Sequence, residues 1–211
     1  MADLKVKRRV LSGAQTNCYY VYREGADEIV IIDPGDRGDV VWNDVKDLGF
    51  EKIAGILLTH GHADHTGGAL ELKKLSGSKI YAYEDEAEIL REPDRNVSGW
   101  FGKPYGFEAD EYFHDGQVFT MAGVEFEVIH TPGHTKGGCC FYAKDDNVLF
   151  CGDTIFNGSV GRTDLYSGSM RALADSIRER IMTLPDDTKL YSGHGDATTV
   201  GYERKYNPCL G

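Results

Sequence analysis

Apolar residues occur in short runs along the chain, and polar turns rich in glycine and proline separate these runs. Runs that alternate with polar residues, or that are continuously apolar, indicate strands, whereas an apolar spacing of three or four indicates a helix. In the first half, the pattern predicts strands over residues 5–11, 18–23, 28–33, 52–59 and 78–83. It predicts helices over residues 40–49 and 67–77. Because residues 52–59 are continuously apolar, we expect this strand to be buried on both faces.

The second half of the chain repeats the plan of strands followed by a helix. The pattern predicts strands within residues 117–133, 137–143, 147–153 and 188–195. An amphipathic helix is predicted over residues 169–184, with Ser167 or Ser169 as its N-cap. Two such halves bury their apolar strands when two sheets face each other and the helices lie outside. The pattern therefore predicts an α/β (α+β) fold of two similar halves in a single domain, residues 1–211.

Residues 91–116 fit neither pattern. The segment is rich in glycine, proline and aromatic residues. Long stretches without secondary structure in a compact domain are usually functional or mobile. We interpret the segment as a surface loop with one helical turn, whose aromatic side chains are candidates for a lid.

Histidine and aspartate side chains follow the ends of the predicted strands. The stretch LLTHGHADHTGG, residues 57–68, carries four such donors within six positions, and three single donors occur in later glycine-rich turns. The seven donors are His60, His62, Asp64, His65, His134, Asp153 and His194. Because strand ends hold side chains rigidly and leave them open to solvent, this placement suits a functional site.

Five histidines and two aspartates are too many ligands for one tetrahedral ion, but they fit two divalent ions that keep open positions for water. His60 and His62 lie two apart on an extended segment, so they point the same way and can hold one ion. Asp64 and His65 turn into the next helix and can face a second ion. Zinc is the expected metal, and iron and manganese suit the same ligands. A histidine network without function, or an adventitious nickel site, is the alternative interpretation.

The chain resembles the metallo-β-lactamase superfamily, and within it the glyoxalase II-like hydrolases. The resemblance covers nearly the whole chain and rests on TNCY (16–19), IIDPG (31–35), THGHADHTGG, TPGHTKGG, GDTIF and SGHG in family order. It implies a four-layer αββα sandwich. It also implies that His60, His62 and His134 hold the first ion, that Asp64, His65 and His194 hold the second, and that Asp153 bridges the two. Full-length glyoxalase II enzymes add a C-terminal helical domain, and we expect this chain to lack it because only seventeen residues follow His194.

Four residues near these motifs need separate interpretation. Asp33 most simply caps a turn through its side chain, and the alternative is that it orients a metal ligand. Arg162 either belongs to a polar loop or faces the pocket and binds an anionic group of the substrate, because a guanidinium pairs well with carboxylates. Glyoxalase II-like enzymes carry a basic residue near this place. We expect His130 to be structural rather than a ligand, and His114 to lie on the surface.

The donors suggest hydrolysis. Two ions close together lower the pKa of a shared water to near neutral, and one ion can polarise a carbonyl and stabilise the developing oxyanion. We expect Asp64 to align this water and Asp153 to bridge the ions, so both are candidate catalytic residues. The sequence suggests no general acid beyond water, and a thiolate leaves without one because thiols have a pKa of about 8.5. The expected substrate is therefore a thioester of the hydroxyacylglutathione type, such as S-lactoylglutathione.

Other functions are open on the same scaffold. Persulfide dioxygenases resemble this family closely and use one iron, held by the counterparts of His60, His62, His134 and Asp153, all of which are present. Lactones, other esters, β-lactams and phosphodiesters are further substrate classes. A metal-binding protein without catalytic activity is the remaining alternative.

Composition and net charge limit the classes of binding partner and the cellular location that we expect. The net charge is 23 − 34 = −11, and an acidic chain repels phosphate backbones, so nucleic-acid binding is not expected. No apolar run approaches the ~20 residues of a membrane span, and the N-terminus lacks the apolar core of a signal peptide. The five cysteines form no disulfide framework; we expect Cys151 to be buried and Cys209 to be exposed. We therefore expect a cytoplasmic enzyme that acts on a small molecule, with its oligomeric state open.

Overall fold

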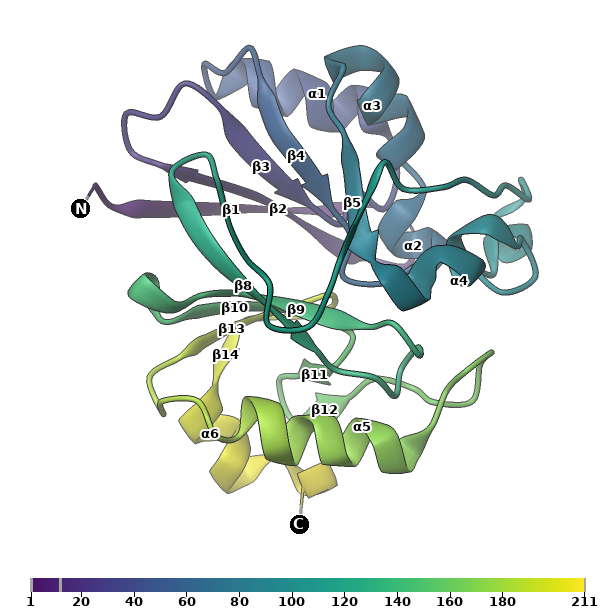
Figure 1. Cartoon of the computed structure of the whole chain (residues 1–211), viewed down its shortest axis with the longest axis vertical. Helices are drawn as coiled ribbons and strands as arrows, with labels where there is room; N and C mark the ends of the chain where they lie inside the picture. Colours follow the sequence, from purple (N-terminus) through teal and green to yellow (C-terminus); the bar gives the residue numbers. More distant parts are fainter. Residues whose placement is uncertain (1, 12, 211) are drawn as a thin grey trace.

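Two six-stranded sheets face each other in the computed structural model, which describes residues 2–11 and 13–210 (Figure 1). In spatial order, the first sheet contains β1 (Leu4–Leu11), β2 (Thr16–Arg23), β3 (Ile29–Ile32), β4 (Ile53–Leu57), β5 (Ile80–Tyr83) and β6 (Glu111–Phe113). The second contains β14 (Thr198–Thr199), β13 (Lys189–Ser192), β10 (Val148–Gly152), β9 (Cys139–Ala143), β8 (Val124–His130) and β7 (Val118–Met121). A small hairpin of β11 (Ile155–Phe156) and β12 (Ser159–Val160) lies beside the second sheet.

Helices cover the outer face of each sheet (Figure 1). The first sheet is covered by α1 (Gly38–Asp47) and α3 (Ala69–Ser76), and the second by α5 (Met170–Ser176), which continues as a π-helical turn over Ile177–Ile181. Shorter helices are α2 (Ala63–Thr66), α4 (Ala87–Arg91) and α6 (Val200–Tyr206). Single 3₁₀ turns occupy Glu84–Glu86, Ser98–Phe101, Lys144–Asp146 and Pro208–Leu210. Ser169 caps α5, because its hydroxyl accepts the amide hydrogen of Ala172 at 3.3 Å, which confirms one of the two predicted N-caps.

Alternating side chains divide each sheet between two apolar layers. Tyr19 and Val21 of the first sheet pack against Phe126, Phe141 and Phe150 of the second, and all five are buried. Side chains on the opposite faces pack against the helices, so strand β4 is buried on both sides as predicted. Each fully buried aromatic or branched side chain contributes about 1.5–3 kcal/mol relative to exposure. The αββα sandwich expected from the sequence is confirmed.

Parallel strands determine where the loops of the first half meet. Strand β4 runs parallel to β3 on one side and to β5 on the other, with Ile32 opposite Leu57 and Ile56 opposite Ile80. The carboxyl ends of neighbouring parallel strands meet at one edge of a sheet. The loops after β3, β4 and β5 therefore lie side by side.

The segment 91–116 is only partly the loop that we predicted. The helical turn is present over Ser98–Phe101, but β6 (Glu111–Phe113) pairs with β5 and extends the sheet. Asn96 is fully buried and donates its side-chain amide to the carbonyl of Tyr105 at 2.9 Å. A three-residue strand has too few positions to show a periodic pattern, which is why the sequence did not indicate it.

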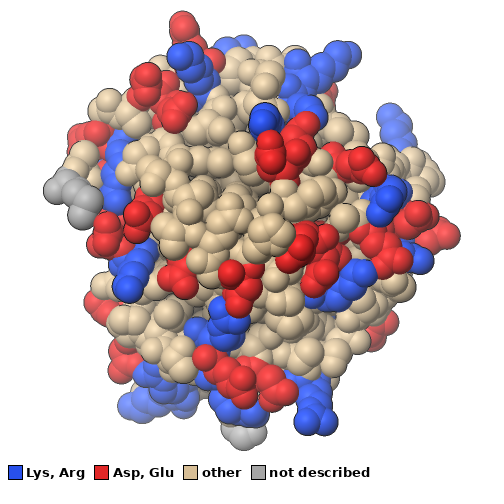
Figure 2. Space-filling view, viewed as in Figure 1, with Lys and Arg blue, Asp and Glu red and all other residues tan. Residues whose placement is uncertain are grey.

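Charged side chains of both signs are interspersed over the face of the molecule in Figure 2. None of the helices within residues 2–11 and 13–210 has the length and apolar character to cross a membrane. Cys151 is buried and Cys209 is exposed, as expected, and both are free thiols. Cys18, Cys139 and Cys140 are also buried and free.

Candidate metal centre

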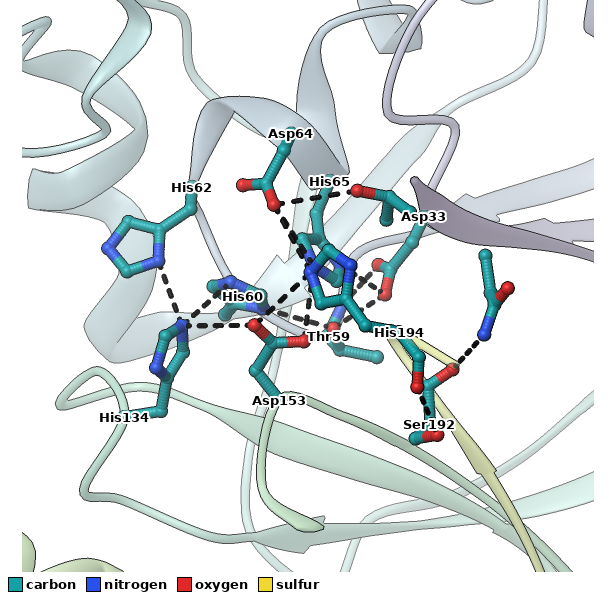
Figure 3. A network of polar contacts seen from close by, with 12 residues as sticks. Asp33, Thr59, His60, His62, Asp64, His65, His134, Asp153, Ser192 and His194 are labelled. Carbon is teal, nitrogen blue, oxygen red and sulfur yellow. Dashed lines mark hydrogen bonds and ion pairs between the residues drawn. The ribbon is translucent and has the colours of Figure 1, made fainter. Parts of the chain in front are cut away.

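The loop that follows β4 contributes four of the seven donors. His60 and His62 lie on its extended part, and His62 is the N-cap residue of α2. Asp64 and His65 lie within the first turn of α2, so the backbone changes from strand to helix in the middle of the donor set. This change of direction turns His62 toward His134 and turns Asp64 toward His194. The ring of His60 lies between these sides, 4.1 Å from the ring of His65 (Figure 3).

The second sheet contributes three donors from three different loops. His134 lies between β8 and β9, Asp153 directly follows β10, and His194 follows β13. Figure 3 shows these side chains pointing toward the loop that follows β4. The structure thus brings together all seven side chains that the sequence singled out.

Three histidines form a compact set, which we call the first-ion group: His60, His62 and His134. Nε2 of His134 lies 2.9 Å from Nδ1 of His62 and 3.2 Å from Nε2 of His60. Burial lowers the pKa of His60 well below its ordinary value and that of His62 to about 3. These two imidazoles are therefore neutral at pH 7, which is the form that binds a metal.

The second-ion group consists of Asp64, His65 and His194. Nε2 of His194 lies 3.3 Å from Oδ2 of Asp64. Burial alone would lower the pKa of His194, but hydrogen bonds with Asp153 and Asp64 raise it to about 9. Burial would likewise lower the pKa of His65, but the charges of Asp153 and Asp33 outweigh it and raise the pKa. In the metal-free protein, His65 and His194 are consequently protonated at neutral pH.

Asp153 lies between the two groups. Its Oδ1 is 3.3 Å from Nε2 of His65, and its Oδ2 is 3.6 Å from Nε2 of both His134 and His194. Burial would raise the pKa of this carboxyl, but the neighbouring histidines hold it well below its usual value. A Cβ atom at Gly193 would come within 2.2 Å of Oδ1 of Asp153, so glycine is required there.

The donor set fits two divalent cations. Nε2 of His62 is buried without a hydrogen-bond partner, and a buried polar atom in this state points to a missing ion or water. Three imidazole nitrogens crowd together in the first-ion group, where a shared cation would satisfy them. Nitrogen and oxygen donors without thiolate suit zinc, iron or manganese.

Asp33 supports the second-ion group. Its carboxylate accepts the amide hydrogen of Thr59 at 2.8 Å and the hydroxyl hydrogen of Thr59 at 2.7 Å, and it lies 2.9 Å from Nδ1 of His65. A carboxylate on one imidazole nitrogen fixes which nitrogen faces a metal. Our preferred interpretation of Asp33 as a turn cap is therefore wrong, and the alternative, that it orients a ligand, is correct.

Arg162 contributes to the site in two ways. Its backbone carbonyl accepts from Nδ1 of His134 at 2.7 Å, which turns Nε2 of that ring toward the other donors. Its guanidinium makes two hydrogen bonds to Asp164, at 2.7 and 2.9 Å, and lies 6.0 Å from the ring of Trp100. The side chain lines the cavity above the donors, and its binding of a substrate anion stays a prediction.

A cavity of about 430 Å³ opens above the donors. Its floor contains His62, Asp64, His134, Asp153 and His194, and its walls contain Val97, Trp100, Phe101, Phe156, Val160, Arg162 and Leu165. The side chains of Trp100 and Phe101 are exposed and border this space, whereas Phe107 is buried. The segment 91–116 thus forms a wall of the cavity through its helical turn.

The last donor is tied to the first hairpin of the chain. The amide of Asn17 donates to the carbonyl of Gly193 at 2.7 Å, and its side-chain amide donates to the carbonyls of Ser192 and Gly195, both at 2.9 Å. Thr16 forms an isolated β-bridge with His194. The hairpin of the first sheet therefore holds the loop of His194 in place.

The two remaining histidines lie away from the donors, as predicted. The ring of His130 stacks on Tyr83 at 4.2 Å, and its Nε2 lies 2.9 Å from the carbonyl of Lys136. His114 is exposed, with Nδ1 2.8 Å from a carboxylate oxygen of Glu84. His130 therefore has a structural role, and His114 lies on the surface.

Two residues that support the donor loops, Thr59 and Glu86, were not identified from the sequence. Thr59 joins Asp33 to the donor loop, and its hydroxyl also lies 3.2 Å from Nδ1 of His60. Glu86 is fully buried, and burial raises its pKa to about 7 although its hydrogen bonds oppose this. It belongs to the acidic run YEDEAE at 83–88, which resembles a solvated surface segment.

Comparison with known proteins extends over nearly the whole chain. The sequence profile of the Metallo-beta-lactamase superfamily matches residues 11–194. Hydroxyacylglutathione hydrolase GloC of Haemophilus influenzae is 35% identical over 199 residues, which cover 93% of each chain. The crystal structure of the B3 metallo-beta-lactamase BLEG-1 is 35% identical, has a TM-score of 0.92, and the match covers 98% of this chain and 99% of that chain. TTHA1623, solved in a di-iron-bound form, is 33% identical with a TM-score of 0.85, and the match covers 96% of this chain and 99% of that chain.

Proposed function

The chain belongs to the metallo-beta-lactamase superfamily of metal-dependent hydrolases, and within it we propose that the protein hydrolyses thioesters of the hydroxyacylglutathione type. The observation that carries this proposal is the convergence of two donor groups on the floor of one cavity, with Asp153 between them. The similarity to a hydroxyacylglutathione hydrolase supports the choice of substrate.

Two divalent ions bound by these donors would supply a water of near-neutral pKa and an electrophile for the substrate carbonyl. We assign His60, His62 and His134 to the first ion, Asp64, His65 and His194 to the second, and Asp153 to both. Asp64 borders the cavity, so its carboxylate can also accept a hydrogen bond from the attacking water and orient it. Asp33 and the carbonyl of Arg162 hold His65 and His134 in the required orientation.

The walls of the cavity favour a leaving group that needs no proton. Among the described residues that line it, the polar side chains are the donors themselves and Arg162. A thiolate departs unprotonated because its conjugate acid has a pKa of about 8.5, whereas an amine or alkoxide needs an acid. Arg162 also lines the cavity, and its guanidinium can bind a carboxylate of the thiol carrier if it exchanges its partner Asp164.

Zinc is the metal that we propose, and iron is the alternative that the di-iron form of TTHA1623 supports. Histidine and carboxylate ligands bind both metals. Metal analysis of the protein as purified, followed by reconstitution with each metal, will identify the ion that supports turnover.

The test is release of free thiol from S-lactoylglutathione by the metal-loaded protein, with metal content measured on the same sample. We expect release that requires two ions per chain and that disappears in the Asp153→Ala variant. Glu203→Gln is a suitable control, because Glu203 is buried but bonds to Thr198, Gly158 and Asn207, away from the donors. Failure of the fully loaded protein to release thiol would rule out this substrate.

Hydrolysis of β-lactams is a second candidate, because the similarity to BLEG-1 extends over 98% of this chain. The nitrogen leaving group of a β-lactam needs a proton, which makes this reaction less suited to the cavity than thioester hydrolysis. A chromogenic cephalosporin added to the same metal-loaded sample distinguishes the two. Oxygen uptake with glutathione persulfide tests the dioxygenase alternative.

A further inference from the structure

Glu86 lies at the point where the two sheets supply the first-ion group. It ends the 3₁₀ turn Glu84–Glu86 that directly follows β5, so it is placed at the same sheet edge as the donor loop after β4. Its side chain is fully buried although it belongs to an acidic run. Burial of a carboxylate is costly unless hydrogen bonds compensate for the lost water.

The hydrogen bonds of Glu86 reach two loops. Oε2 accepts the amide hydrogen of Gly61 at 2.7 Å, in the loop over residues 58–62. Oε1 accepts the hydroxyl hydrogen of Thr135 at 2.6 Å and the amide hydrogen of Gly137 at 3.0 Å, in the loop over residues 131–138. One carboxylate therefore satisfies three donors on two loops that come from opposite sheets.

These three contacts surround the first-ion group. Gly61 separates His60 from His62, and Thr135 directly follows His134. The carboxylate does not contact the imidazoles, so it acts on them only through the backbone. Burial raises the pKa of Glu86 to about 7, so its carboxylate is partly ionised at neutral pH. Its three hydrogen bonds restrain both loops, and they are strongest in the ionised form.

Close packing shows that the side chain has a fixed place. A Cβ atom at Gly61 would lie 2.7 Å from Oε2 of Glu86, and one at Gly137 would lie 2.5 Å from its backbone nitrogen. Both glycines thus allow the loops to approach Glu86 closely.

We propose that Glu86 is a positioning residue that joins the 58–62 loop to the 131–138 loop and sets the geometry of the first-ion group. It is the counterpart of Asp33, which supports the second-ion group through His65. The proposal rests on the metal assignment made under the proposed function, but not on the substrate.

The test measures metal affinity without substrate. A His194→Ala background removes a donor of the second-ion group only, so the ion that stays bound reports on the first-ion group. In this background we expect Glu86→Gln to weaken Zn²⁺ binding about 10- to 100-fold, the usual effect of losing a residue that supports metal ligands. The amide places an N–H group against a backbone N–H of one loop and breaks the link. Competition with a chromophoric chelator gives the affinity.

Glu203→Gln in the same background is the matched control. Glu203 is equally buried and accepts a threonine hydroxyl, a glycine amide and a side-chain amide, at 2.5, 2.9 and 2.8 Å. We expect its affinity for Zn²⁺ to equal that of the background protein. An unchanged affinity in Glu86→Gln, or an equal loss in Glu203→Gln, would overturn the proposal.

Thr135→Val is the second variant, in case Glu86→Gln does not fold. It removes one of the three hydrogen bonds and leaves the carboxylate in place. We expect a weaker effect in the same direction, a loss of up to about tenfold. Circular dichroism of each metal-free protein verifies the fold, and unchanged affinity in a folded Thr135→Val would contradict the proposal.

If the background protein itself binds no Zn²⁺, the metal assignment fails, whereas loss of thioester turnover alone leaves this inference intact.

Discussion

The first-ion and second-ion groups both contribute side chains to the floor of one cavity, but their histidines differ in protonation. In the first-ion group, burial lowers the pKa of His60 well below its ordinary value and that of His62 to about 3. In the second-ion group, carboxylates outweigh burial and raise the pKa of His194 to about 9. The difference arises because three carboxylates, of Asp153, Asp33 and Asp64, raise the pKa of His65, whereas three imidazoles, of His65, His134 and His62, lower that of His60.

The two groups of the metal-free protein therefore differ in the protonation of the histidines that would bind a metal ion. At pH 7 the neutral imidazoles of His60 and His62 can bind a cation directly. The second-ion group must release protons first, so its apparent affinity depends on pH. We therefore expect the first-ion group to fill at lower pH than the second.

Removal of Asp153 should have the largest effect, because it contacts both groups. We expect Asp153→Ala to lower turnover of the metal-loaded protein about 10⁴-fold, as when one member of a catalytic unit is lost. Steady-state kinetics together with metal analysis check this result. Retention of two ions with turnover within tenfold of the wild type would show that the groups do not need this bridge.

Replacement of either buried carboxylate, Asp33 or Glu86, should weaken metal binding at one group and leave the other group unchanged. We expect Asp33→Asn to weaken the second ion by about 10- to 100-fold and Glu86→Gln to weaken the first by a similar factor. Each variant is measured with one group disabled, His62→Ala for the former and His194→Ala for the latter. If either substitution weakened metal binding equally at both groups, Asp33 and Glu86 would not each support one group specifically.

The stability of the metal-free protein should depend on pH through His194. Its pKa is raised to about 9 from the ordinary value of 6.5, so its protonated form stabilises the fold fully below pH 6.5. This contribution is lost as the pH rises through about 9, because the folded state then releases the proton. Urea unfolding with a chelator present, from about pH 6 to about pH 9.5, should show a decline that is reduced in His194→Ala. An identical decline in the variant would assign the effect to other residues.

Arg162 should have the smallest effect, because its guanidinium is exposed and already paired with Asp164. We expect Arg162→Ala to raise KM about tenfold with little change in kcat, since it removes binding that is equal in the ground and transition states. Asp164→Asn is the informative companion, because it frees the guanidinium and should lower KM. A fall in kcat with unchanged KM would instead mean that the substitution shifts the backbone carbonyl of residue 162, which accepts from His134.

Prediction from the sequence succeeded where donors follow strands with strong patterns. The four donors after β4 follow a continuous apolar run, and the later three follow strands that the same pattern identified. The arrangement of two facing sheets then brings these ends together. This is why the seven side chains and the sandwich could be predicted without coordinates.

The supporting role of Asp33 could be named only as an alternative, and that of Glu86 was not anticipated, because the partners of both are distant in sequence. Glu86 binds Thr135, which is 49 positions away, and Asp33 contacts His65, which is 32 positions away. An acidic run and an Asp-Pro-Gly turn have ordinary explanations at the surface. Only the packing of one loop on another shows that these carboxylates are buried.

The attachment of the first hairpin to the loop of His194 has a consequence for how the protein folds. Asn17 contacts Ser192, 175 positions further along the chain. Contacts of such separation close late, because the loop entropy must be overcome before they form. We therefore expect the loop of His194, which this contact holds, to become ordered later in folding than the contacts between neighbouring strands.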